Sequence, residues 1–316
     1  MRSIYSAALP QTIWTYPLPD PAPPTLDPVA LARWHRAAPL ETPWLHEEVA
    51  RRMHERLAWI KRKPQNWTDW EPVRGGVEAH EALMRDFGPH GLVLERLPHR
   101  QQVARQRWQP SWWQPRRWRK DAASFQPAPA SQDMVWANMA LHLEAEPQAL
   151  MAQWHQLLKV DGFVMFSCLG PDSALELRQL YQALGWPPAG HELTDMHDWG
   201  DMLVHSGFAE PVMDMERLTL TFESPERLLQ ELAGLGRNFH PQRFAALRGR
   251  HWKAHLLAAM LELMPRQPDG SWPLSFELIY GHAIKPAPRF KLEATSQVSL
   301  DEMRRMLKAA DPSSGA

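Results

Sequence analysis

The segment 44–63, WLHEEVARRMHERLAWIKRK, repeats apolar residues at every third or fourth position. Leu45, Val49, Met53 and Leu57 therefore share one helical face, and acidic residues precede basic ones as a helix favours. Apolar spacing and turn residues predict further helices over 76–87, 99–108, 147–159, 172–184, 195–206, 224–235 and about 242–263.

Short apolar runs between these helices have the length of strands. They lie at 67–69, 91–95, 133–138, 163–168, 217–222 and 276–285. Strands that alternate with helices predict a mainly parallel sheet covered on both faces. The last two strands instead frame helical material, so we expect the final strand to return antiparallel. The predicted fold class is a doubly wound α/β sheet, whose ligands bind at the carboxyl ends of the strands.

Charge and cysteine content restrict the classes of function. The formal net charge is −1, so no global field draws the chain to nucleic acid or to a membrane. The single cysteine, Cys168, excludes an internal disulfide and suits a reducing cytosol. No apolar run approaches the roughly 18 residues of a membrane span. We expect a soluble, cytoplasmic protein that holds no metal ion.

Proline-rich stretches suggest where the domain begins and ends. Residues 1–29 form a proline-rich leader that we expect to be extended and mobile. A single domain is expected over 30–286, with 225–264 as a helical insertion over the cleft. Residues 287–316 form a polar tail.

The tract RQRWQPSWWQPRRWRK, 105–120, interleaves basic residues with tryptophan. Such a tract can bind single-stranded nucleic acid by stacking and charge, although the neutral overall charge argues against that partner. It can dock an acidic carrier protein. It can also be a proline-broken loop that covers the edge of the sheet.

Several blocks, in one order, resemble a known family. They are DMVWANMALHL, LLKVDGFVMFSCLGPDSALELRQ, TDMHDWGDMLVHSGFAEPVMDMERLTLTF, LAGLGRN and ELIYGHAIK. These blocks are similar to the malonyl-acyl-carrier-protein O-methyltransferases of biotin synthesis, and the resemblance runs from about 30 to 286. It implies a seven-strand, Rossmann-like methyltransferase fold, S-adenosylmethionine as cofactor, and an acyl-carrier protein as partner through the tract 105–120.

The family's glycine-rich cofactor loop is degenerate in this chain. Family members usually read I-K-x-x-P-x-x-V-L-D-x-G-C-G-x-G, and this chain reads IKRKPQNWTDWEPVRGG. Asp69 and Gly75 match the pattern, whereas Glu71 and Val73 replace two glycines. Glycine lets the backbone approach a ligand and adopt a positive φ, so these replacements change the loop.

The resemblance assigns further site residues by position. It implies that Glu95 accepts the ribose hydroxyls, that Asp121 binds the adenine amine and that Ala122 lies beside the ring. It places Asn138 under the methionyl part and His142 near the substrate, where family members often have glutamine. The family's N-R-F is His191-Glu192-Leu193 here, so its arginine is missing.

No catalytic base is assigned, because a carboxylate is already ionised and nucleophilic at neutral pH. Two hypotheses remain open. The chain is an active O-methyltransferase for the free carboxyl of malonyl-acyl-carrier protein, with a rebuilt cofactor loop. Alternatively, it is a catalytically impaired protein of this fold that acts as a binding or regulatory partner.

Overall fold

The computed structural model describes residues 26–88, 91–108, 127–246 and 248–288. By their contacts the residues divide into two units, Met1–Pro286 and Ala287–Ala316, and only two residues of the second are described. Most of the predicted leader and tail lies outside the described residues. So do residues 109–126, which include Asp121, Ala122 and most of the basic tract.

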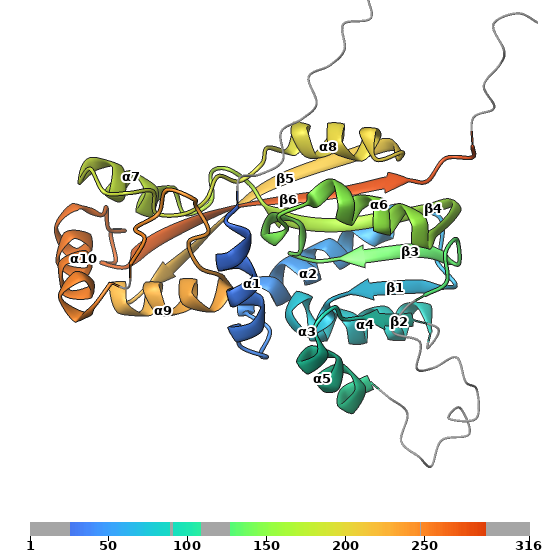
Figure 1. The fold of residues 1–316 in the computed structure, drawn as a ribbon, viewed down its shortest axis with the longest axis horizontal. Coiled ribbons are helices and arrows are strands. Elements are labelled where there is room, and N and C mark those ends of the chain that lie inside the picture. Colours follow the sequence, from blue (N-terminus) through green and yellow to red (C-terminus); the bar gives the residue numbers. More distant parts are fainter. Residues whose placement is uncertain (1–25, 89–90, 109–126, 247, 289–316) are drawn as a thin grey trace, which may run out of the picture. The chain divides into compact units, whose positions relative to one another are not determined.

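A six-stranded sheet, ordered β2-β1-β3-β4-β6-β5, forms the centre of the first unit (Figure 1). Its strands are β1 (Trp67–Trp70), β2 (Gly91–Leu94), β3 (Gln132–Ala137), β4 (Leu158–Leu169), β5 (Ala209–Phe222) and β6 (Trp272–Ile284). Strands β2, β1, β3 and β4 are parallel, and β6 is antiparallel to both β4 and β5. The doubly wound sheet with an antiparallel last strand is thus confirmed.

The expected count of seven strands is wrong for the part of the chain that the structure describes, which contains six. The chain offers six apolar runs of strand length. Between the helix that ends at Trp108 and β3, the sequence carries prolines and arginines instead of a seventh run. Most of that segment, residues 109–126, lies outside the described residues.

Helices cover both faces of the sheet because side chains alternate along its buried strands. In β3, Met134 and Trp136 pack in one apolar cluster, whereas Val135 and Ala137 pack in another. The first cluster includes α2 (Trp44–Arg56) and α4 (Val77–Phe87), and the second includes α6 (Pro147–Leu157) and α8 (Met196–His205). The remaining helices are α1 (Pro28–Ala37), η1 (Leu57–Trp59), α3 (Pro72–Gly75), α5 (Pro98–Trp108), η4 (Leu141–Leu143), α7 (Leu175–Ala183), α9 (Pro225–Leu235) and α10 (Arg250–Leu263).

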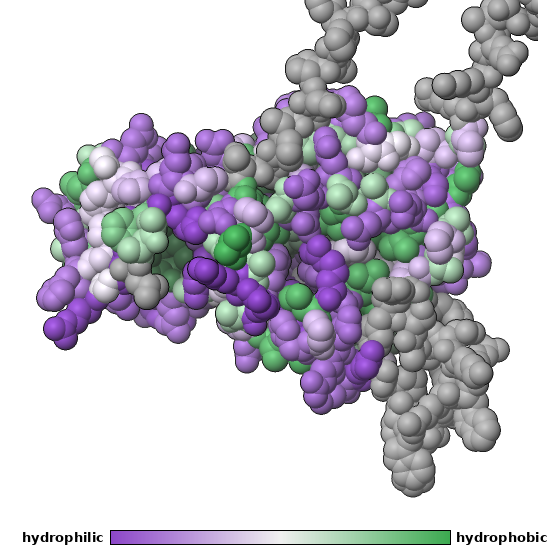
Figure 2. Space-filling model, viewed as in Figure 1, coloured by the Kyte–Doolittle hydropathy of each residue, from purple (hydrophilic) through white to green (hydrophobic). Residues whose placement is uncertain are grey.

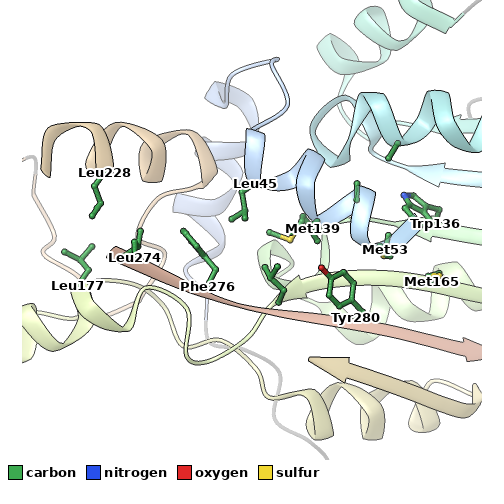
Figure 3. Packing of buried hydrophobic residues seen from close by; sticks show 14 of the residues in the cluster. Leu45, Met53, Trp136, Met139, Met165, Leu177, Leu228, Leu274, Phe276 and Tyr280 are labelled. Atoms are coloured by element: carbon green, nitrogen blue, oxygen red, sulfur yellow. The ribbon is translucent and has the colours of Figure 1, made fainter. Parts of the chain in front are cut away.

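Strands β5 and β6 extend beyond the parallel strands and carry a second group of helices, α7, α9 and α10 (Figure 1). Leu177 of α7 and Leu228 of α9 gather there with Leu274 and Phe276 of β6 (Figure 3). The core is therefore continuous from the sheet into this extension.

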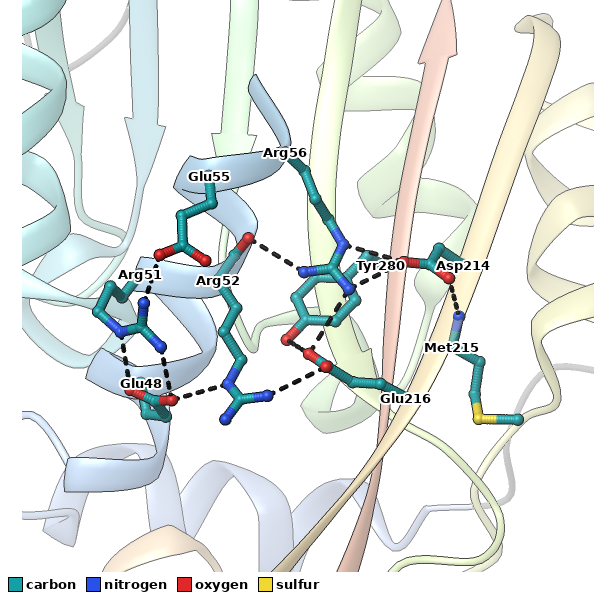
Figure 4. A network of polar contacts seen from close by, with 9 residues as sticks. All are labelled: Glu48, Arg51, Arg52, Glu55, Arg56, Asp214, Met215, Glu216 and Tyr280. Carbon is teal, nitrogen blue, oxygen red and sulfur yellow. Dashed lines mark hydrogen bonds and ion pairs between the residues drawn. The ribbon is translucent and has the colours of Figure 1, made fainter. Parts of the chain in front are cut away.

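An ionic network holds α2 against β5 and β6 (Figure 4). Arg52 donates to Glu216 at 3.0 Å, and Arg56 donates to Asp214 at 2.8 Å. The Tyr280 hydroxyl donates to Glu216 at 2.7 Å, and the Arg56 guanidinium lies 3.8 Å from the centre of its ring. The helix is thereby fixed beside the loop that follows β1.

Candidate functional site

The carboxyl ends of β1 and β3 meet at the switch point of the sheet, where doubly wound proteins bind their ligands. A cavity of about 30 Å³ lies there. Glu71 and Gly75 line it from the loop after β1, and Asn138 and Met139 line it from the segment after β3. Trp34, Arg74, Arg96 and Arg100 fill much of the remaining wall. Cofactor sites usually measure about 300–1,000 Å³, so this cavity is an order of magnitude too small for a nucleoside.

The degenerate loop forms one helical turn, α3, after a left-handed residue. Glu71 has φ 55°, the conformation that glycine adopts without penalty. For an L-residue with a Cβ, this conformation costs about 1–2 kcal/mol. The backbone at Glu71 thus keeps a glycine-like shape after the side chain has changed.

Every backbone N–H between Glu71 and Gly76 has a partner within the chain. The acceptors are Leu94 O for Glu71, Glu95 Oε1 for Val73, Glu71 O for Arg74 and Gly75, and Pro72 O for Gly76. Pro72 has no N–H to donate. A loop that cradles an anionic ligand offers free N–H groups, and this loop has none left.

The Glu71 side chain is held by two arginines that sequence reasoning missed. Arg96 donates to it at 2.7 Å and also donates to Glu144 at 2.6 Å, while Arg100 lies 3.8 Å away. Burial alone would raise the pKa of Glu71, but the two arginines outweigh burial and its pKa lies below the ordinary value. The available signal was Glu71 itself, since a buried acid requires a cation nearby.

Glu95 is buried, and its carboxylate accepts the Val73 N–H at 2.9 Å through Oε1. Its Oε2 has no hydrogen-bond partner among the described residues. Burial, assisted by the nearby charge of Glu71, raises the pKa of Glu95 to about 8. One of its two oxygens is thus bonded to the loop. The other is buried and unpaired, and it carries the proton when the group is neutral.

Asp69 is buried and bonded to another side chain of the protein. It is 2% exposed, and His80 Nδ1 of α4 lies 2.9 Å from its Oδ2. Burial raises the pKa of Asp69, and the bond to His80 opposes that rise. The pair joins the end of β1 to α4.

Gly75 and Asn138 contact each other directly. The Asn138 side-chain amide donates to Gly75 O and, at 2.8 Å, to His46 O, while its Oδ1 accepts from Ser167 at 2.6 Å. A Cβ on Gly75 would lie 3.2 Å from Asn138 O, so any other residue would have to push the Asn138 backbone away by a few tenths of an ångström. The structure brings the two predicted residues together, with protein groups on each polar atom of the Asn138 side chain.

Arg74, a third residue that sequence reasoning missed, ties distant segments to the loop. It is 6% exposed and donates to Pro39 O at 3.1 Å, Glu41 O at 3.3 Å and Gly234 O at 2.8 Å. Gly234 belongs to α9. The Arg74 side chain therefore links three parts of the chain at the small cavity: the N-terminal segment, the loop after β1 and helix α9.

His142, the predicted substrate residue, lies in η4 and lines a second, larger cavity of about 390 Å³. Figure 2 shows this hollow between α7 and α9, with apolar side chains inside and hydrophilic ones around its rim. Leu143, the next residue, lines both cavities, so the two are neighbours across η4.

The residues present do not fit S-adenosylmethionine in this conformation. We call the small cavity, together with the loop from Glu71 to Gly76, the cradle. The unpaired Oε2 of Glu95 suits a ribose hydroxyl, but Glu95 does not line the small cavity and its Oε1 is bonded to the Val73 N–H. Glu71 and its two arginines form the cavity wall instead. Asp121 and Ala122, predicted at the adenine, lie outside the described residues. Within the described ranges, no three His, Cys, Asp or Glu side chains gather as metal ligands, and no helix is long and apolar enough to cross a membrane.

The chain was compared with known proteins by sequence and by fold. No model of a known protein family matches the chain. The malonyl-[acyl-carrier protein] O-methyltransferase of Gallionella capsiferriformans is 37% identical over 253 residues, covering 78% of this chain and 85% of that protein. The protein of the same name from Laribacter hongkongensis is 34% identical over 276 residues, covering 84% and 89%.

A solved structure that resembles the chain is the 1,6-didemethyltoxoflavin-N1-methyltransferase of Burkholderia thailandensis with S-adenosylhomocysteine. It is 15% identical, covers 84% of this chain and 93% of its own, and has a TM-score of 0.42. The sequence relatives decide the assignment. The chain belongs to the malonyl-[acyl-carrier protein] O-methyltransferase family.

Proposed function

We propose that this chain is an S-adenosylmethionine-dependent O-methyltransferase that esterifies the free carboxyl of malonyl-acyl-carrier protein, a step of biotin synthesis, in the cytoplasm. The observation that carries the proposal is identity of 34–37% to proteins named for this reaction, over 85–89% of their length. The methyltransferase domain of this proposal spans 30–286, with 225–264 as an insertion whose helix α9 lines the larger cavity.

Methylation of a carboxylate does not require an acid or base from the protein. A malonyl carboxylate is ionised at neutral pH, so the chain has only to position it and exclude water. The larger cavity can do both, because apolar side chains from α7, α9 and β6 surround it. His142 stands at its border with the cradle.

Methyl transfer requires the cradle to open first. Entry of a nucleoside would have to displace the Glu71–Arg96 pair, because both residues line the small cavity. To reach both Glu95 oxygens it would also have to displace the Val73–Glu95 bond. If the cradle opened in this way, Glu95, Gly75 and Asn138 would hold the cofactor, which is the role that the sequence analysis assigned to them. Asp69 would act through His80 and the end of β1 rather than by contact.

The closed cradle favours a second candidate, a protein of this family that keeps the fold and the acyl cavity without methyl transfer. In that case the chain binds an acylated carrier protein and leaves it unchanged. The favouring observation is that each N–H of residues 71–76 is already bonded within the chain.

One experiment separates the two candidates. Purified chain is incubated with malonyl-acyl-carrier protein and S-adenosylmethionine, and the carrier protein is analysed by mass spectrometry for the methyl ester. Formation of the ester supports the enzyme. Binding of the carrier protein without ester, together with no calorimetric signal for millimolar S-adenosylmethionine, supports the second candidate.

The carrier-protein surface remains a sequence-based proposal. Arg116, Arg117 and Arg119 lie in the basic tract, outside the described residues. Changing all three to glutamate should weaken binding of the acidic carrier protein and reduce its salt dependence. Unchanged affinity at low salt would exclude the tract as the docking surface.

A further inference from the structure

The cavity of about 390 Å³ has the size of a ligand site, within the roughly 300–1,000 Å³ usual for small molecules. Its walls are mainly apolar, with Leu177 and Tyr181 from α7, Leu229 and Leu232 from α9, and Phe276 from β6. Such walls suit an acyl thioester arm and do not by themselves select an anion.

A cation on α7 changes the chemistry of this cavity. Two arginines line it, Arg178 and Arg237. Arg237 Nη1 donates to the backbone oxygens of Ala233 and Gly236 at the end of α9, whereas Arg178 Nη2 donates to the backbone oxygen of His191 at 2.9 Å. That carbonyl is neutral, and no carboxylate lies within ion-pair distance of Arg178 among the described residues, although the charges of Glu192 and Asp172 act on it from farther away. A guanidinium has five N–H donors, so a planar carboxylate can still be bound by the others.

Two histidines border the same cavity as neutral groups. Burial lowers the pKa of His142 well below its ordinary value, and burial lowers the pKa of His191 to about 4. Neither ring therefore adds charge at pH 7. His142 Nδ1 is buried and has no partner among the described residues, so it is able to bond a polar atom of a ligand.

From these observations we infer that the cavity is an acyl pocket for a short chain with a terminal carboxylate, and that Arg178 is the cation that selects the carboxylate. The inference rests on the proposed function for the identity of the thioester. It assigns to an α7 side chain the charge that is absent at His191-Glu192-Leu193. Leu143 separates this pocket from the cradle, so a carboxylate near η4 lies beside the methyl-transfer position.

Binding measurements test the inference without methyl transfer. Malonyl-pantetheine, acetyl-pantetheine and free malonate are titrated by calorimetry into the full chain. We expect wild type to bind malonyl-pantetheine at least tenfold more tightly than acetyl-pantetheine, which lacks only the carboxylate. Malonate alone should bind weakly because it leaves the apolar walls unfilled. Malonate binding as tight as malonyl-pantetheine would overturn the thioester assignment.

Variants then locate the selecting charge. Arg178→Gln should bind both thioesters alike, and Arg178→Lys should keep part of the preference. Arg51→Gln is the control, since Arg51 pairs with Glu48 and Glu55 of its own helix and does not line the cavity. The inference is overturned if wild type binds the malonyl and acetyl thioesters equally, or if Arg178→Gln still prefers the malonyl thioester. If wild type prefers malonyl-pantetheine but forms no ester, the proposed function is contradicted and this inference is supported. If Arg178→Gln forms the ester with an unchanged KM for the malonyl thioester, the proposed function is supported and this inference is contradicted.

Discussion

The Val73 N–H donates to Glu95 Oε1 at 2.9 Å, so the acid predicted to receive the ribose instead closes the loop beside it. A glycine loop would have left that N–H free for a ligand. In this chain the bond joins α3 to the end of β2, and the cradle holds about 30 Å³. Cofactor affinity is therefore coupled to the stability of the closed loop.

Replacing Glu71 by glycine should reopen the cradle. The change removes the carboxylate that holds Arg96 and relieves a left-handed strain of about 1–2 kcal/mol. We expect S-adenosylmethionine to bind at least tenfold more tightly than to wild type, measured by calorimetry. Glu71→Gln, which keeps the volume and removes the charge, is the control. No gain in Glu71→Gly would place the closure elsewhere, in the Val73–Glu95 bond.

Glu95 should make folding stability depend on pH. Its pKa is about 8 when folded and near the model-peptide value of about 4.3 when unfolded, so the folded state holds the proton more tightly between these values. This contribution is present at low pH and is lost as pH rises through 8, with a slope of at most about 1.4 kcal/mol per pH unit. Urea unfolding at pH 5 and pH 8 should show the loss in wild type and less of it in Glu95→Gln. Identical pH dependence in the two proteins would contradict the buried, unpaired acid.

His80→Phe should destabilise the fold while keeping an aromatic ring in place. The substitution keeps the contacts with Trp67 and Trp108 but leaves Asp69 buried without a partner, at a cost of about 3 kcal/mol. Asp69→Asn, which still accepts a hydrogen bond from His80, should cost about 1 kcal/mol. Denaturant unfolding gives both values. Equal, small losses would show that the pair does not support the end of β1.

Glu216→Ala should weaken the attachment of α2 more than Asp214→Ala. Glu216 accepts from Arg52 and from the buried Tyr280 hydroxyl, whereas the side chain of Asp214 is 50% exposed (Figure 4). We expect a loss of about 1–3 kcal/mol for Glu216→Ala, because the hydroxyl loses its acceptor, and at most about 1 kcal/mol for Asp214→Ala. Thermal unfolding of the two variants checks the order, and a reversed order would contradict the arrangement of the network.

The sequence by itself indicated six strands and most of the helices, the doubly wound sheet and its antiparallel last strand. These features follow from local periodicity and turn residues, which a linear pattern records. The sequence did not predict α1 or the first half of β5. The pattern also indicated that the loop after β1 was altered, because Glu71 and Val73 stand in place of glycines. The family blocks identified the relatives for the same reason, since they are continuous in the chain.

Only the tertiary structure decided what occupies the cradle. Arg96 and Glu144 are 48 residues apart, and Arg74 and Gly234 are 160 apart, so no local pattern pairs them. Asp69, predicted at the cofactor, contacts His80 of the helix that returns over the end of β1, and the linear pattern did not indicate this pairing. Arg178 faces a cavity built from α7, α9 and β6, elements that meet only when the long strands extend past the sheet. Long-range packing, which side-chain periodicity does not encode, therefore determines which charges are satisfied by the protein and which remain for a ligand.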